Sequence, residues 1–271
     1  MNRFGKMMMP GVGLLAMLAV GCFSATTYAQ APAGPAGPAP MTPGGAGGPG
    51  GAGRIAPVQP SPAMVAASHT LAPYFTAATA APKPVDADGF LRRWLLLEPI
   101  NKPNRGNTVF VDSYVRKNLA DTEYFPGQFG DVPKNGDTVT AGDQQLKWHA
   151  LDSSLFDVKL YNFAWGLSKQ TYGVIFWAVT VVNSPREIEH VRMAVGSNSA
   201  SMWWLNGKDS VDLFGDRRMV EDDVVSSLTT LHKGKNIVRG AVINGPGLSD
   251  FCVRFIDENG KPITGLTTSV Q

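Results

Sequence analysis

From residue 86 onward, short apolar runs alternate with polar, turn-forming residues, and each run has the length of a strand. Such spacing is typical of an all-β domain. The one short helix that the pattern predicts covers residues 111–121, where Tyr114, Val115 and Leu119 lie near helical spacing. Strands are predicted over residues 89–100, 145–151, 157–165, 172–185, 188–196, 201–207, 211–214, 235–245 and 251–260.

The number of strands and their short polar links indicate the fold class. Eight or nine strands connected in this way favour an antiparallel β-sandwich or jelly roll over an open sheet. The sequence therefore predicts an all-β domain with one short helix, spanning residues 86–271.

Two adjacent tryptophans precede a predicted hairpin at Asn206 and Gly207, because Asn-Gly fits the positive φ angles of a type I′ turn. Alternation along the strand places Trp203 on one face of the sheet and Trp204 on the other. We therefore expect one tryptophan in the core and its neighbour, Trp204, at the surface.

Residues 31–85 are rich in Ala, Pro and Gly and carry almost no charge. A segment of this composition cannot bury enough apolar surface to offset its ordering entropy, so it is predicted to be a disordered tether. Within it, residues 64–81 are more apolar. They are expected either to pack on the domain or to form a short helix.

Residues 1–30 read as an export signal. Basic Arg3 and Lys6 precede an apolar run that is shorter than the roughly 20 residues needed to span a bilayer. Cleavage near residues 26–31 would release the protein. The alternative is the lipobox-like LAVGC at residues 18–22, which would make Cys22 a lipid-anchored N-terminus. The predicted location is therefore periplasmic, outer-membrane-anchored or extracellular.

Charge is distributed unevenly along the chain. The first 85 residues contain four basic side chains and no acidic ones. Of the 24 Lys and Arg residues, 20 thus remain in residues 86–271, against all 22 Asp and Glu residues, a net charge of −2. A domain this close to neutral has no general electrostatic attraction for nucleic acid, so no nucleic-acid partner is predicted.

No strong catalytic motif is present. A G-x-S-x-G elbow is absent from the sequence, and its four histidines show no i, i+4 pair that would suggest a metal site. A glycosidase needs two carboxylates at a defined separation, and the acidic cluster Glu221, Asp222 and Asp223 contains the candidates. DADG at residues 86–89 imitates the start of a calcium loop. Enzymatic activity thus stays open, and a structural calcium ion is the one cofactor the sequence allows.

Aromatic residues offer a plausible chemistry, because sugar rings present C–H patches that pack on aromatic faces. Trp204 and Trp165 are the predicted ligand-binding tryptophans, and Arg217 and Arg218 would donate hydrogen bonds to hydroxyls from a nearby loop. For each tryptophan the alternative is packing in the core. For the charged loop the alternative is mutual pairing of Arg217 with its acidic neighbours.

Three stretches carry a resemblance to a known family: WLNG at 204–207, LHKGKNIVRGAV at 231–242 and FCVRFIDENGKPI at 251–263. They resemble the galactose-binding-like β-sandwich, as in the sugar-binding domains of glycoside hydrolase family 2 and the jelly rolls attached to bacterial carbohydrate-active esterases. GFLRRWLLLEPI at 89–100 is similar to the first strand of such domains, so the resemblance covers about residues 86–268.

The resemblance implies a non-catalytic module that binds carbohydrate or envelope polysaccharide, and the predicted signal in residues 1–30 would export it. Members of this family range from carbohydrate binders to spacer domains. Two alternatives therefore stay open. The first is a structural or interaction subunit that docks a partner protein, such as a degradative enzyme. The second is a small carbohydrate-active hydrolase whose site the sequence does not reveal.

Overall fold

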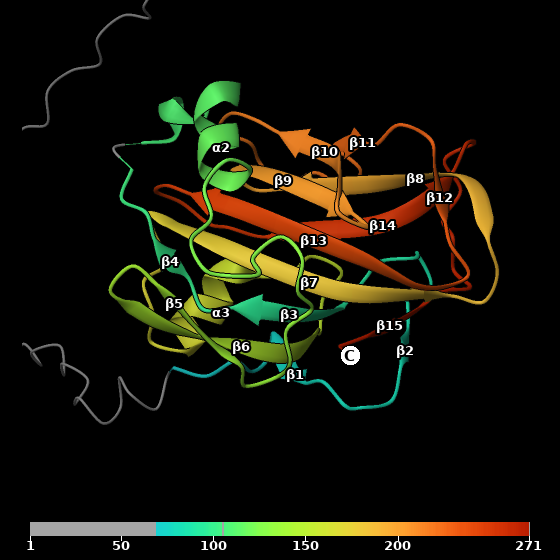
Figure 1. Cartoon of the computed structure of the whole chain (residues 1–271), viewed down its shortest axis with the longest axis horizontal. Coiled ribbons are helices and arrows are strands. Elements are labelled where there is room, and N and C mark those ends of the chain that lie inside the picture. The colour runs from blue at the N-terminus through green and yellow to red at the C-terminus, as the bar shows by residue number, and fades with distance from the viewer. Residues whose placement is uncertain (1–68, 105, 271) are drawn as a thin grey trace, which may run out of the picture. The chain divides into compact units, whose positions relative to one another are not determined.

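The computed structural model of the protein describes residues 69–104 and 106–270 (Figure 1). The predicted signal peptide, Cys22 and the tether as far as residue 68 lie outside the described residues.

A large antiparallel sheet of eleven strands dominates the fold. Its strands follow the order β1-β6-β3-β7-β13-β9-β10, and β2, β4, β5 and β15 pair beside this path. The bounds are β1 (Phe75–Ala77), β2 (Lys83–Pro84), β3 (Arg93–Leu97), β4 (Ile100–Asn101), β5 (Thr138–Ala141), β6 (Gln144–Ser153), β7 (Val174–Ser184), β9 (Ala200–Leu205), β10 (Lys208–Leu213), β13 (Gly234–Asn244) and β15 (Thr267–Ser269).

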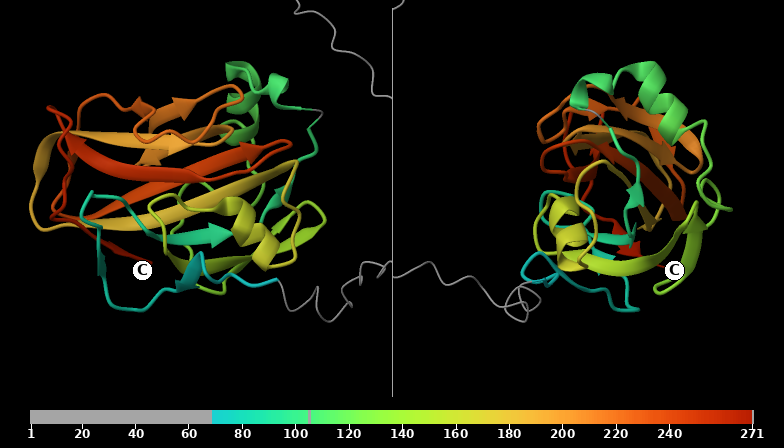
Figure 2. Two further views of the ribbon diagram at one scale, coloured as in Figure 1. Left: turned by 180° about the vertical axis from the view of Figure 1, so that it is seen from behind. Right: turned by 90° about the vertical axis from the view of Figure 1, so that its left-hand side faces the viewer.

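A second antiparallel sheet of four strands packs against one face of the large sheet (Figure 2). In it, β8 (Ile188–Ser197) pairs with β11 (Val224–Val225), β12 (Thr229–Leu231) and β14 (Phe251–Asp257). The antiparallel β-sandwich expected from the sequence is therefore confirmed.

The sandwich core lies between the two sheets. Trp94 and Trp203 of the large sheet pack edge to face there, and both rings contact Phe251 of the small sheet. Gly240 on β13 leaves room for this packing, because a Cβ atom at that position would lie 2.2 Å from the Trp203 ring.

A second core lies on the opposite face of the large sheet. The helix α2 (Asp112–Leu119) covers part of this face with Val115 and Leu119, and the loop of residues 120–137 covers more of it with Phe125 (Figure 1). The central strands are thus buried on both faces. All six residues of β9 are buried, so this strand does not show the alternation expected of a sheet with one solvated face.

The Asn-Gly hairpin is confirmed. Asn206 and Gly207 have φ angles of 52° and 79°, as a type I′ turn requires, and they connect β9 to β10.

The predicted helix at 111–121 is confirmed as α2, but the strand predicted over residues 157–165 is wrong. That segment contains a second helix, α3 (Leu160–Gly166). Leu160, Phe163 and Ala164 have the i, i+3, i+4 spacing of a helix and are buried in the sandwich core. A short 3₁₀ helix, η1 (Asn107–Val109), precedes α2. None of the helices that the structure describes is long and apolar enough to span a bilayer.

The folded domain begins before residue 86, the boundary expected from composition. Strand β1 pairs with β6, and Phe75 within it is 3% exposed and contacts Phe163. Strand β2 pairs with β15 near the end of the chain. The apolar part of the predicted tether thus packs on the domain from residue 69 onward, and residues 69–81 do not form a helix there.

Candidate ligand-binding groove

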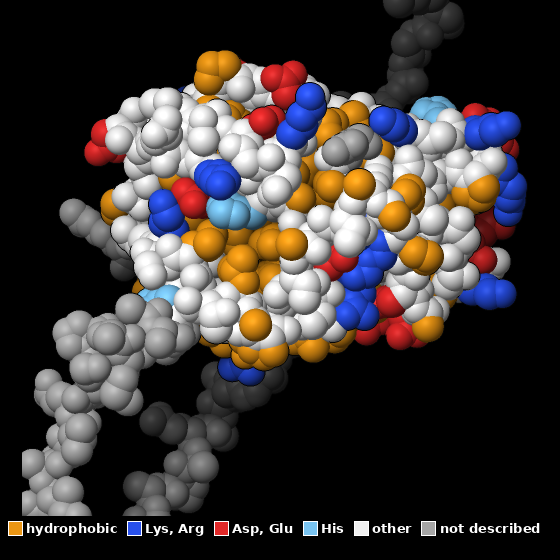
Figure 3. All heavy atoms as spheres, turned by 90° about the horizontal axis from the view of Figure 1, so that it is seen from below, with side chains coloured by type: hydrophobic (Ala, Val, Ile, Leu, Met, Phe, Trp, Pro, Cys, Tyr) orange, Lys and Arg blue, Asp and Glu red, His pale blue; other side chains and the backbone are white. Residues whose placement is uncertain are grey.

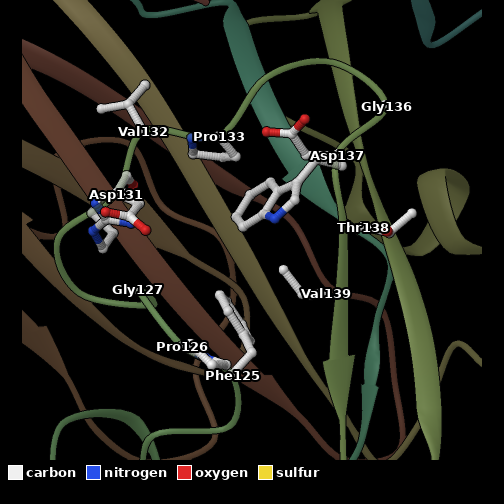
Figure 4. Close-up of a pocket in the computed structure, with 12 residues that line it drawn as sticks. Phe125, Pro126, Gly127, Asp131, Val132, Pro133, Gly136, Asp137, Thr138 and Val139 are labelled. Atoms are coloured by element: carbon white, nitrogen blue, oxygen red, sulfur yellow. Dashed lines mark hydrogen bonds between the residues drawn. The ribbon is translucent and has the colours of Figure 1, made fainter.

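The loop of residues 120–137 connects α2 to β5 and leaves an open groove, here called the loop groove, over the large sheet. Its volume is about 670 Å³. Figure 4 shows the residues that line it, which are Phe125, Pro126, Gly127, Asp131, Val132, Pro133, Gly136, Asp137, Thr138, Val139, Trp148 and Arg239. Loops of this length without regular structure are uncommon in compact domains unless they serve a function.

Internal hydrogen bonds hold the loop in shape. The Gln128 side chain is fully buried; it accepts a hydrogen bond from the Tyr124 N–H at 2.8 Å and donates one to the Thr122 carbonyl at 2.9 Å. Farther along, the Asn135 side chain accepts a bond from the Ala150 N–H of β6 at 2.9 Å. The groove is therefore formed before any ligand binds.

Arg239 on β13 fixes the loop from below. Its guanidinium donates to the main-chain carbonyls of Gln128 and Asp131 at 2.8 and 2.7 Å, and the residue is only 4% exposed. Burial lowers the pKa of Arg239 to about 10, although the nearby Asp131 carboxylate opposes this effect. The partners of this cation are carbonyl groups, which leaves its charge less compensated than in an ion pair.

Two carboxylates, those of Asp131 and Asp137, face the groove from different sides (Figure 4). Asp137 accepts a hydrogen bond from the Lys134 N–H at 2.8 Å, which orients its carboxylate. Both aspartates are exposed, whereas Phe125 and Trp148 at the base of the groove are 5% and 2% exposed.

The groove thus combines donors, acceptors and apolar walls. Arg239 and Thr138 can donate hydrogen bonds, Asp131 and Asp137 can accept them, and the side chains of Val132, Pro133 and Val139 are apolar. A ligand whose groups both donate and accept suits this mixture better than an ion of either sign. Neutral hydroxyl groups on a ring with apolar C–H patches have these properties.

Trp204 is not at the surface, and that expectation is wrong. The residue is 8% exposed, stacks on Trp177 with ring centroids 5.8 Å apart, and meets Phe129 of the covering loop at 6.1 Å. Burial follows because the loop covers the face of β9 that was expected to meet solvent.

Trp165 is exposed, as expected, with 43% of its surface accessible. It lies on α3, not at a strand end, and stacks on His69 with centroids 4.3 Å apart. Its role in ligand binding stays a prediction.

The two predicted arginines lie in the loop between β10 and β11. The Nε atom of Arg217 bonds Asp223 at 2.8 Å, which confirms the alternative of mutual pairing. Arg218 is exposed. Neither arginine and neither predicted tryptophan lines the loop groove, so the structure does not gather the four predicted residues there.

The other acidic motifs serve the fold. Glu221 and Asp222 both bind Arg254, at 2.6 Å and 3.0 Å. In DADG, the Asp86 carboxylate accepts hydrogen bonds from the main chain of Asp88 and Phe90 and so closes a turn. Within residues 69–104 and 106–270, no group of three His, Cys, Asp or Glu side chains is arranged to hold a metal ion.

The residues of the loop groove were missed by sequence reasoning. One usable signal was Arg239, a lone charge in the apolar stretch IVRGAVI, because a buried charge needs partners. The identity of those partners, more than 100 residues earlier in the chain, carried no sequence signal.

No protein-family model matches the chain, and no curated protein matches it. Solved structures with some likeness include a PA14 sugar-binding domain from an RTX adhesin, at 13% identity and a TM-score of 0.36 over 66% of this chain and 99% of that one. The PA14 domain of the MpAFP antifreeze protein matches at 9% identity and a TM-score of 0.36, over 72% of this chain and 95% of that one. A beta-glucosidase from Kluyveromyces marxianus matches at 13% identity and a TM-score of 0.34, over 67% of this chain and 17% of that one. Likeness this distant supports no conclusion about the ligand.

Proposed function

We propose that the protein is a non-catalytic module that binds a neutral, hydroxyl-rich glycan in the loop groove. The observation that carries this proposal is the composition of the groove. A buried guanidinium and two exposed carboxylates line one preformed hollow beside apolar walls. Sugar hydroxyls can accept from the first and donate to the second.

The size of the site is compatible with a polymer as ligand. The loop groove is open, and its volume of about 670 Å³ lies within the range of about 300–1,000 Å³ that is usual for ligand pockets. The export signal predicted in residues 1–30 would bring the module to polysaccharides of the cell envelope or the surroundings. The proposal therefore includes export, either by cleavage near residues 26–31 or by lipidation at Cys22.

A second candidate, docking of a partner protein, has its own support. Exposed apolar patches often mark protein interaction sites. Figure 3 shows apolar side chains gathered in the middle of the face seen from below. The large apolar residues with more than a third of their surface exposed include Leu155, Phe156, Trp165, Tyr172 and Leu248.

Affinity electrophoresis of the full chain in gels that contain one polysaccharide each, neutral or charged, tests the proposed function. We expect at least one neutral polysaccharide to retard the wild type. The double variant Asp131→Asn, Asp137→Asn should bind at least about tenfold more weakly, because a hydrogen bond to a charged acceptor contributes about 1.5–3 kcal/mol.

The matched control is Asp143→Asn, an exposed aspartate in the β5–β6 turn that does not line the groove. It should bind like the wild type. Equal retardation of the double variant and the control would remove the groove as the site. No retardation by any polysaccharide would shift the weight to the docking of a partner protein, and release of sugars would show a hydrolase.

A further inference from the structure

A second cavity, of about 300 Å³, lies beside α3 and is here called the α3 cavity. Its lining residues are Tyr74, Lys159, Tyr161, Asn162, Leu248, Ser249 and Asp250. Helix α3 packs into the sandwich core, whereas Phe125 and Trp148 of the loop groove belong to the core on the other face of the large sheet. The two cavities therefore lie on opposite faces of that sheet.

The α3 cavity carries excess negative charge. The Lys159 ammonium binds the carboxylates of Asp157 and Asp250, the latter at 2.9 Å. The side chains of Asp157 and Asp250 are only 12% and 6% exposed. Burial lowers the pKa of Lys159, but the two carboxylates outweigh burial and raise it. One cation thus compensates two buried anions, and buried charge without a partner is costly.

Two oxygens in the wall of the α3 cavity lack hydrogen bonds. Asp250 Oδ1 and Ser249 Oγ have no partner in the described part of the chain, and their residues are 4% and 1% exposed. A buried polar group left unpaired costs about 1–3 kcal/mol. Main-chain bonds fix both residues in place, from the Tyr161 N–H to the Ser249 carbonyl at 3.0 Å and from the Asn198 N–H to the Asp250 carbonyl at 2.9 Å.

Two tyrosine rings line the cavity, and further aromatic rings lie close to one of them. Tyr74 and Tyr161 line the α3 cavity, and the ring of Tyr172 lies 5.7 Å from that of Tyr161. Trp165 lies one helical turn after Tyr161, on the same side of α3. Aromatic faces attract cations and also pack against the C–H faces of sugars.

We propose that the α3 cavity binds an amine-bearing sugar unit. An ammonium group has three N–H donors and no acceptor, so it matches two acceptors in the cavity wall, Asp250 Oδ1 and Ser249 Oγ, that lack partners in the described residues. It also supplies the positive charge that Lys159 alone does not provide. The sugar ring then packs on Tyr161 or Tyr74. This assignment rests on the proposed function only in taking the ligand to be a glycan.

Titration of the isotope-labelled full chain by NMR tests the proposal, with three methyl glycosides as probes: glucosaminide, N-acetylglucosaminide and glucoside. They differ at one ring position, as free amine, amide and hydroxyl. We expect the amine to bind at least about tenfold more tightly than either neutral probe, with shifts at Tyr161 and Asp250. A neutral probe that binds as tightly as the amine would overturn the proposal, and so would no binding of any probe.

Two variants keep the proposal testable. Asp250→Asn should abolish the preference for the amine, and Tyr161→Ala, at a half-buried rim residue, should weaken binding without unfolding the domain. Unchanged amine affinity in Tyr161→Ala and in folded Asp250→Asn would also overturn it. The double variant Asp131→Asn, Asp137→Asn should bind the amine like the wild type. This variant therefore distinguishes a failure of the proposal for the α3 cavity from a failure of the proposed function of the loop groove.

Discussion

Arg239 shows how one residue can organise a site. Its guanidinium sits beneath the loop of residues 120–137 and bonds two carbonyl groups, although burial opposes its charge. The same side chain fixes the loop and lines the groove, so a change at this residue affects both stability and binding.

Arg239→Met keeps an unbranched, flexible side chain but removes the guanidinium and its donors. We expect the free energy of unfolding to fall by about 1–3 kcal/mol, because the Gln128 and Asp131 carbonyls lose their partners and relief from charge burial offsets only part of the loss. Chemical denaturation measures the change. Arg218→Met, at an exposed residue, should stay within about 0.5 kcal/mol of the wild type. Equal stability of both variants would show that the loop does not depend on Arg239.

Asp212 on β10 carries a pH dependence. Burial raises its pKa to about 6, the nearby Asp209 adds to the shift, and Arg116 opposes it. The native state thus binds this proton more tightly than the unfolded state, whose carboxyl has a pKa of about 3.9. The proton-linked stability is present in full below about pH 4 and is lost as the pH rises through about 6.

We therefore expect Asp212→Asn to gain stability relative to the wild type as the pH rises from 4 to 7. The amide never bears the charge that the native state disfavours. Denaturation curves at several pH values measure the difference, with Asp143→Asn as the exposed control. A difference between Asp212→Asn and the wild type that does not change with pH would contradict the assignment.

At the scale of elements, the hydrophobic pattern predicted most strands but not the faces they expose. A period of two distinguishes the faces of a strand without telling how many layers cover the sheet. Strand β9 lies in a sheet covered on both sides, so Trp204 is buried although its neighbour Trp203 fills the sandwich core. Helix α3 was missed because its seven residues, rich in aromatic side chains, are too few to separate a helical period from a strand.

The two tryptophans singled out by the sequence give a matched pair of variants. Trp204→Ala should lower the free energy of unfolding by about 3–5 kcal/mol, because it leaves a large cavity beside Trp177. Trp165→Ala should cost less than about 1 kcal/mol, because its side chain is 43% exposed. Urea titration of both variants checks this order. A Trp165 variant that is as unstable as the Trp204 variant would contradict the assignment of Trp204 to the core and Trp165 to the surface.

At the scale of the whole molecule, composition misplaced the start of the domain. The Ala- and Pro-rich texture continues to residue 85, yet Phe75 is 3% exposed in the sandwich core, and the Thr79 hydroxyl accepts a hydrogen bond from Arg93 at 3.2 Å. Composition reports the average tendency of a segment to fold. It does not register one aromatic anchor or a strand of three residues.

A chain that begins at residue 86 should therefore be less stable than one that begins at residue 69. Loss of the buried Phe75 side chain alone removes about 2 kcal/mol, and the β1 and β2 pairings are lost with it. Thermal unfolding of the two chains measures the difference. Identical melting temperatures would show that residues 69–85 contribute nothing to the fold.

The residues of the loop groove come from segments that only the tertiary structure brings together. For this reason the sequence predicted a class of function, carbohydrate binding, but not the residues of the site.

The direct test of the groove is NMR titration of the full chain with a neutral oligosaccharide from the polysaccharide that retards it most. We expect shifts concentrated at residues 125–139, with the Arg239 side-chain and Trp148 indole N–H signals among them. Shifts that avoid this loop, with binding intact, would contradict the central claim that the groove recognises the glycan.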